Sequence, residues 1–104
     1  MTLRRWDARR DGPLTEAAMR RALVALGYEV ARYDYPPGTR FGAHTHAIDK
    51  IDGVVAGRFR ITMGGDAVVL EAGDWIEVPA GAEHAAEVVG DETVVSLDAV
   101  RARR

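Results

Sequence analysis

Residues 38–57 read GTRFGAHTHAIDKIDGVVAG, and this stretch carries most of the information about the architecture. His44 and His46 lie two residues apart in it. On a β-strand, residues i and i+2 point to the same face about 7 Å apart. Two imidazoles arranged in this way can bind one metal ion, at about 2.0–2.1 Å from each nitrogen. The stretch therefore indicates a strand that ends in a pair of candidate metal ligands.

One further histidine, His84, follows a turn that is marked by Pro79 and Gly81. All the histidine of the chain thus lies at two places, each at the start or end of an expected strand. In an antiparallel barrel these places can face each other across the interior. A lone buried histidine usually belongs to a core, whereas a His-x-His pair with a third histidine after a turn is a candidate metal site.

From Tyr28 onward the hydrophobicity alternates with a period of two, and turn residues interrupt it about every 8–12 residues. This pattern predicts strands near 28–35, 40–46, 51–57, 58–63, 67–71, 75–78, 84–89 and 93–98. Seven or eight short strands in about 70 residues are typical of an all-β, antiparallel jelly-roll β-barrel.

The first 27 residues differ, because Thr15–Gly27 has the pattern of one short N-terminal α-helix. Thr15 can serve as the N-cap and Gly27 as the C-terminal stop. The apolar stripe is narrow, so we expect the helix to lean on a sheet. We predict an N-terminal arm and helix over 1–27, a single barrel domain over 28–100 and a basic tail over 101–104.

The composition is that of one globular domain: 104 residues, 47% apolar, 29% charged, with a formal net charge of -2. This balance excludes a disordered chain and argues against a nucleic-acid binder, whose domain is usually basic. No run of about 18 apolar residues predicts a membrane span. The arginine-rich segment Met1–Asp11 lacks the apolar core of a secretory signal, so we expect a cytoplasmic protein.

Cysteine, asparagine and glutamine are absent, and Lys50 is the only lysine beside thirteen arginines. The absence of cysteine rules out disulfides, thiolate nucleophiles and thiolate metal ligands. Any metal site must therefore be made of histidine, aspartate, glutamate or water.

The first histidine-containing stretch resembles the first motif of the cupin superfamily. The matching pattern is Gly38-x5-His44-x-His46-x3-Lys50-x6-Gly57, with one substitution, at Lys50. Cupins usually have a glutamate ligand at that position.

The second stretch, Gly73-x5-Pro79-x-Gly81-x2-His84, resembles the second cupin motif through its histidine. The spacer between the motifs, residues 58–72, is similar to those of small single-domain microbial cupins. Val88 stands where the motif usually closes with asparagine, and it is easily accommodated as one more inward apolar side chain.

The resemblance implies a six-stranded barrel motif within a jelly roll, and a homodimer. It also implies that His44, His46 and His84 bind a divalent metal ion inside the barrel, such as Fe, Mn, Ni, Cu or Zn. Three neutral histidines leave such an ion near +2, and the ammonium of Lys50 adds like-charge repulsion.

Three arrangements of these residues would relieve or avoid this repulsion. In the first, the three histidines hold the metal, and Lys50 pairs with Asp52, which shares its face by strand alternation, or with Asp49 in the preceding loop. In the second, Asp49 or Asp52 becomes a carboxylate ligand. In the third, no metal binds, and Lys50 and the histidines form a polar pocket for an anionic ligand.

Lys50 also has a catalytic interpretation, because a lysine in an apolar barrel beside positive charge can act as a general base or Schiff-base amine. The alternative is a structural ion pair. Among the aromatic residues, Tyr33 and Tyr35 share one strand face, at the barrel mouth or exposed. We expect Phe41 in the barrel core, and Trp75 at a dimer contact or under the helix.

Two classes of function follow. The first is a small metal-dependent enzyme of the dioxygenase, isomerase or decarboxylase type, acting on a small organic acid, with Lys50 and Asp52 as catalytic or substrate-binding residues. The second is a non-enzymatic metal-binding or small-molecule sensor barrel, for which the altered residue at position 50 is the distinguishing feature. A vestigial site in a structural subunit is a third interpretation.

Overall fold

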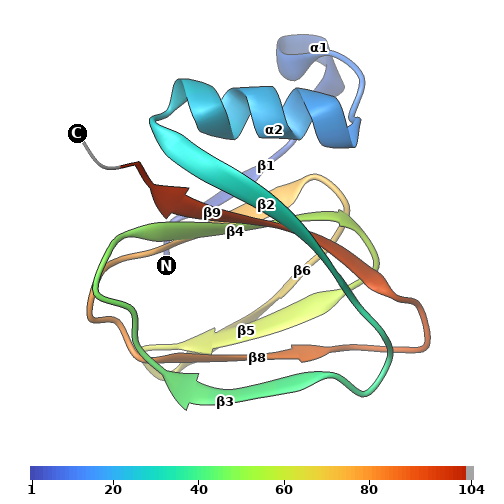
Figure 1. Cartoon of the computed structure of the whole chain (residues 1–104). Helices are drawn as coiled ribbons and strands as arrows, with labels where there is room; N and C mark the ends of the chain where they lie inside the picture. Colours follow the sequence, from blue (N-terminus) through green and yellow to red (C-terminus); the bar gives the residue numbers. More distant parts are fainter. Residues whose placement is uncertain (103–104) are drawn as a thin grey trace.

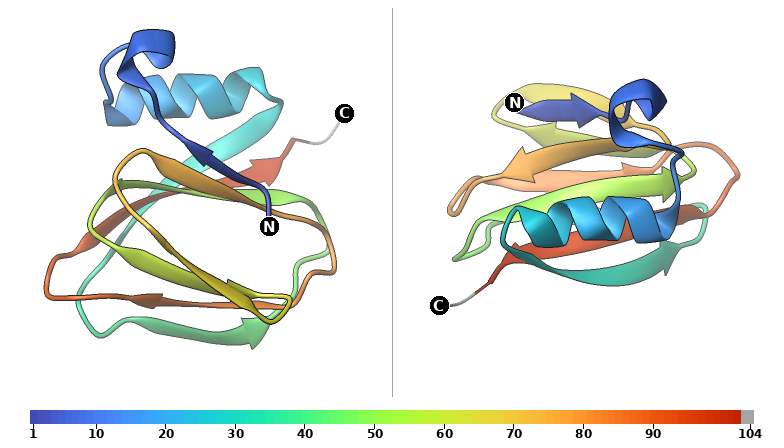
Figure 2. Two further views of the ribbon diagram at one scale, coloured as in Figure 1. Left: turned by 180° about the vertical axis from the view of Figure 1, so that it is seen from behind. Right: turned by 90° about the horizontal axis from the view of Figure 1, so that it is seen from above.

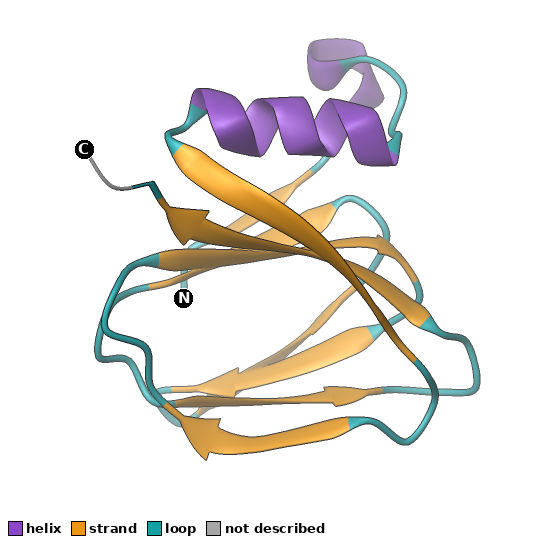
Figure 3. Cartoon of the chain, in the orientation of Figure 1, coloured by secondary structure: helices purple, strands orange, loops and turns teal. Residues whose placement is uncertain are grey.

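The computed structural model describes residues 1–102 as nine strands and two helices arranged in layers (Figures 1 and 3). The helices are α1 (Ala8–Asp11) and α2 (Glu16–Ala25). The strands are β1 (Leu3–Arg5), β2 (Tyr28–Tyr35), β3 (Arg40–His44), β4 (Lys50–Ala56), β5 (Phe59–Met63), β6 (Asp66–Leu70), β7 (Asp74–Val78), β8 (His84–Val88) and β9 (Val94–Arg101).

The strands form two antiparallel sheets that pack face to face. One has the order β1-β7-β4-β9-β2 and the other β3-β8-β5-β6. No strand of the described residues is hydrogen-bonded into both sheets, so the barrel is a flattened sandwich. Figure 1 shows α2 lying on the outer side of the five-stranded sheet, and the view from above in Figure 2 shows it crossing that sheet. The predicted all-β jelly-roll architecture is confirmed.

The main core lies between the sheets, and strand alternation selects its members. On β7, Ile76 and Val78 point inward, whereas Trp75 points to the other face. The remaining buried members of this inner core are Val54, Phe59, Ile61, Leu70, Val88 and Val94. Val88 thus packs inward as an apolar side chain, as expected.

A second core lies between α2 and the outer face of the five-stranded sheet. Met19 and Leu23 of α2 are fully buried against Trp75 and Leu97. The helix therefore leans on a sheet, as predicted, and Trp75 lies under it. A Cβ on Gly53 would come within 2.9 Å of the Met19 sulfur, so glycine at this position lets the helix approach closely.

The ends of α2 follow the predicted signals. Thr15 Oγ1 accepts a hydrogen bond from Ala18 N at 3.0 Å, which satisfies one free donor of the first turn. Gly27 adopts a φ of 94°, the left-handed conformation with which helices commonly end.

Two short N-terminal elements were not predicted. β1 pairs with β7, with Leu3 opposite Ile76, and α1 is a single turn capped by Asp7. The ion pair between Arg4 and Asp11, 2.8 Å apart, joins the two elements. Elements of three and four residues are too short to show a period, and pairing with a distant strand stabilises them.

The C-terminal strand is longer than expected. β9 continues to Arg101, whose guanidinium lies over the ring of Tyr28 at 5.4 Å from the ring centroid. Arg101 is therefore part of the sheet, and residues 103–104 of the expected tail lie outside the described residues. Among residues 1–102, no helix is long and apolar enough to cross a membrane.

Candidate metal centre

The three histidines come together at one end of the sandwich. His44 ends β3 and His84 begins β8, and the antiparallel register places them directly opposite each other. His46 lies in the loop after β3, and its carbonyl accepts a hydrogen bond from Gly81 N at 2.9 Å, which joins the two motif segments. A register shift in β3 between Phe41 and His44 marks the point where that strand leaves regular pairing.

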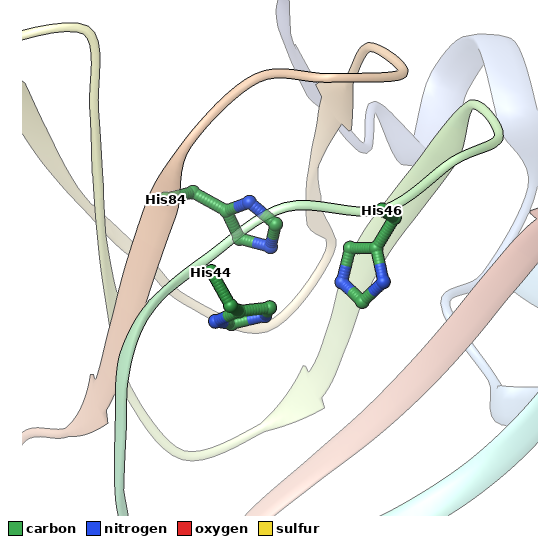
Figure 4. Close-up of side chains that lie close together, drawn as sticks. All are labelled: His44, His46 and His84. Carbon is green, nitrogen blue, oxygen red and sulfur yellow. The ribbon is translucent and has the colours of Figure 1, made fainter.

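The side chains converge on one another, as Figure 4 shows. Each histidine offers a ligand nitrogen, and the three nitrogens lie within 4.8 Å of one another. The ring centroids are 4.9 Å apart for His44 and His46, 4.2 Å for His44 and His84, and 5.1 Å for His46 and His84.

Backbone carbonyls orient two of the rings. His44 Nδ1 is 2.6 Å from Gly42 O, and His84 Nδ1 is 3.0 Å from Ala82 O. A carbonyl oxygen only accepts, so each Nδ1 must carry the proton and donate it. The Nε2 lone pair of His44 and of His84 is then free to bind a metal, the arrangement that outer hydrogen bonds impose on histidine ligands.

His46 supplies the strongest indication that the donor set fits a metal ion. Its Nε2 is buried and has no hydrogen-bond partner. Burial, followed by the nearby ammonium of Lys50, lowers the pKa of His46, which favours the neutral ring that binds metals. A buried nitrogen without a partner destabilises the folded protein, and a bound metal ion would satisfy its lone pair. The donor set therefore fits a divalent metal.

Lys50 begins β4 and points into the space beside the histidines, with 8% of its surface exposed. Its Nζ lies 2.6 Å from Asp98 Oδ1 and 3.7 Å from Asp52 Oδ1. Asp52 thus shares the inward face with Lys50, but the shorter ion pair is with Asp98, which sequence reasoning missed. The signal was present on β9, where Asp98 is the one acidic residue of a mainly apolar strand, but its partner depends on the pairing of β4 with β9.

Asp49 lies in the loop before β4, and its carboxylate forms no ion pair with the ammonium of Lys50, whose partners are Asp98 and Asp52. Its Oδ1 accepts a hydrogen bond from Ala80 N at 2.8 Å, and its backbone carbonyl accepts one from Arg101 N. Asp49 also stands outside the histidine cluster. Its carboxylate therefore fixes the turn before β8.

Burial raises the pKa of Asp52 above its usual range, an effect that the Lys50 charge opposes and the Asp98 carboxylate reinforces. Burial, together with the charges of Asp98 and Asp52, raises the pKa of Tyr35 to about 12. Tyr35 therefore keeps its phenolic proton near neutral pH.

These residues line a cavity of about 210 Å³ between the sheets. One part of its wall is polar: His44, His46, His84, Lys50, Asp52, Ser96 and Asp98. The other part is apolar or aromatic: Tyr35, Phe41, Phe59 and Ala86.

The tyrosines of β2 occupy different environments. Tyr35 lines the cavity, whereas Tyr33 is 49% exposed and stacks on Tyr35 with a centroid distance of 6.2 Å. The sequence predicted Phe41 in the barrel core, and this prediction is wrong. Phe41 lies on the cavity wall with 37% of its surface exposed. The register shift in β3 and the edge position of that strand account for this exposure.

A comparison with protein families agrees with the fold and the histidine cluster. The family model described as "Cupin domain" matches residues 31–100. The chain belongs to this family. A comparison with curated proteins finds no match.

Several solved structures share the fold of this chain. A predicted oxalate decarboxylase from Thermotoga maritima is 25% identical with a TM-score of 0.66, over 86% of this chain and 76% of that one. The DMSP lyase DddQ from Ruegeria pomeroyi is 25% identical with a TM-score of 0.65, over 73% of this chain and 39% of that one. KdgF from Halomonas sp. is 23% identical with a TM-score of 0.64, over 74% of this chain and 71% of that one.

Proposed function

We propose that this cupin binds a divalent metal ion through His44, His46 and His84 and receives a small molecule in the adjoining cavity. The observation that carries the proposal is the buried, unpartnered Nε2 of His46 beside two imidazoles whose Nδ1 atoms are held by carbonyls. Iron, manganese, nickel, copper and zinc all accept imidazole ligands in sites of this kind.

The proposed activity is that of a dioxygenase- or isomerase-like enzyme acting on a small organic acid. A metal bound here would supply Lewis-acid or dioxygen-binding chemistry. Lys50 and Asp52 are held beside Asp98 in the cavity wall, where they can hydrogen-bond a neutral group of the substrate, such as a hydroxyl, while a bound metal would attract its acidic group. Two structures similar to this chain are described as a lyase and as a predicted oxalate decarboxylase, which supports an enzymatic function.

The second candidate is a non-enzymatic metal- or small-molecule-binding barrel, such as a sensor. It is favoured by the Lys50–Asp98 ion pair, which occupies the place of the usual glutamate ligand. A turnover screen of small organic acids with the metal-loaded protein separates the two. Substrate consumption that disappears in His84→Ala supports the enzyme.

Metal content tests the site directly. Protein purified without a histidine tag and incubated with zinc should retain about one ion per chain, because the three imidazoles converge on one position. His44→Ala, His46→Ala and His84→Ala should each lose most of it. Thr45→Ala, an exposed neighbour between two of the ligands, is the matched control and should retain it. Unchanged zinc in the three histidine variants would refute the proposed site.

We further propose that the protein is a cytoplasmic homodimer. An exposed edge strand supports the dimer, because β2 ends the five-stranded sheet and carries the half-exposed Tyr33. Light scattering coupled to size exclusion tests the oligomeric state, and imaging of a tagged chain tests the location.

A further inference from the structure

The cavity has no cation left over for an anionic ligand. Lys50 is the only lysine or arginine among the residues that line it. Its ammonium already faces two carboxylates, Asp98 at 2.6 Å and Asp52 at 3.7 Å. An acid that approached Lys50 would have to displace Asp98 and would be repelled by both aspartates. The charge that attracts an acid must therefore come from a bound metal ion.

The apolar part of the cavity wall is mainly a cluster of three aromatic rings. The ring centroid of Tyr35 lies 5.5 Å from that of Phe59 and 5.0 Å from that of Phe41. Phe59 is buried in the core and holds the wall in place, whereas Phe41 lines the cavity and has 37% of its surface exposed, part of it in a second hollow shared with Arg60 and Thr62. Covering this apolar area with a ligand ring is favourable, and paired rings gain further from edge-to-face or offset contacts.

The volume limits the size of the ligand. The cavity, of about 210 Å³, is smaller than the roughly 300–1,000 Å³ of pockets that bury drug-sized molecules. One six-membered ring with a short acidic substituent fits this space.

We propose that the ligand is a small acid with a single aromatic ring, whose acidic head faces the histidines and whose ring lies against Tyr35, Phe41 and Phe59. The acid binds only after the metal. This inference rests on the proposed metal site and adds the ligand class and the order of binding.

The test compares mandelate with lactate, because the two share a 2-hydroxy-acid head and differ only in a phenyl or methyl group. Calorimetric titration of the zinc-loaded protein should give a dissociation constant for mandelate that is at least tenfold lower than for lactate. In Phe41→Ala and Phe41→Leu the dissociation constant for mandelate should rise roughly tenfold, while that for lactate should stay within about twofold of the wild-type value. Val24→Ala, which truncates an exposed apolar side chain on α2, is the control and should change neither.

The zinc content of each sample is measured first, so that two kinds of failure are distinguished. If the wild-type protein retains no zinc, the proposed metal site fails and this inference fails with it. If zinc is retained but mandelate and lactate bind equally, or if Phe41→Ala leaves the preference intact, only this inference is overturned. The metal-free protein should bind mandelate at least tenfold more weakly. Equal binding with and without zinc would overturn the proposed order.

Discussion

At the scale of single residues, Lys50 shows how a change at one position is balanced at another. A lysine beside three histidines is unfavourable for a metal site, and Asp98 provides the compensating charge at 2.6 Å. The lysine was visible in the sequence as a departure from the first cupin motif. Its partner was not, because 48 positions separate the two and only the pairing of β4 with β9 brings them together.

Removing Asp98 should therefore destabilise the protein through Lys50. Asp98→Ala leaves a buried ammonium with only the more distant Asp52, which should lower the free energy of unfolding by about 2–3 kcal/mol. The loss is below the roughly 3–5 kcal/mol of a fully buried pair because the Asp98 side chain is a quarter exposed. The zinc dissociation constant should also rise. Urea denaturation and zinc titration measure the two effects.

Combining Asp98→Ala with Lys50→Met should recover about half of the lost stability, because the uncompensated ammonium is gone but the buried Asp52 is left without its cation. Asp34→Ala, which breaks the exposed ion pair with Arg32, is the control and should leave the free energy of unfolding nearly unchanged. A double variant as unstable as Asp98→Ala would contradict this account.

At the scale of elements, what the sequence could predict depended on the length of each element and on local signals. β2 was expected over 28–35 and is found there, and α2 has the expected cap at Thr15. β1 and α1 were missed because their stability comes from β7 and from ion pairs, not from their own pattern. The different environments of Tyr33 and Tyr35 also depend on the opposing sheet, which alternation does not describe.

The turn between β4 and β5 requires glycine for two separate reasons. Gly57 has a φ of 82°, and a Cβ there would lie 2.7 Å from Thr93 O. Gly64, in the turn between β5 and β6, also has positive φ but open space around it. Gly57→Ala should therefore cost more than about 3 kcal/mol, and Gly64→Ala about 1 kcal/mol. Thermal and urea denaturation compare the two variants, and equal losses would show that crowding at Thr93 is unimportant.

At the scale of the whole molecule, the metal-free protein should lose stability in mild acid. The native pKa of His46 lies below its value in the unfolded chain, so between the two values the unfolded chain binds more protons. The free energy of unfolding then rises with pH across this window, and it falls as the pH is lowered below about 6.5. Urea denaturation between about pH 7.5 and about pH 5 measures this slope.

His46→Ala should show a smaller slope, because the shifted group is absent. Thr45→Ala should keep the slope of the wild type. An unchanged slope in His46→Ala would assign the acid sensitivity to another group.

The position of β9 in its sheet has a consequence for biosynthesis. β9 is the last strand of the described residues, yet it lies between β4 and β2 and carries the counter-charge for Lys50. Until residues 94–101 have emerged from the ribosome, β2 has no partner within its sheet and β4 can pair only with β7. The nascent chain therefore exposes unpaired strand edges until β9 emerges, the situation in which chains associate wrongly and chaperones are needed. The five-stranded sheet, and with it the ion pair beside the histidines, is completed only when translation has passed β9.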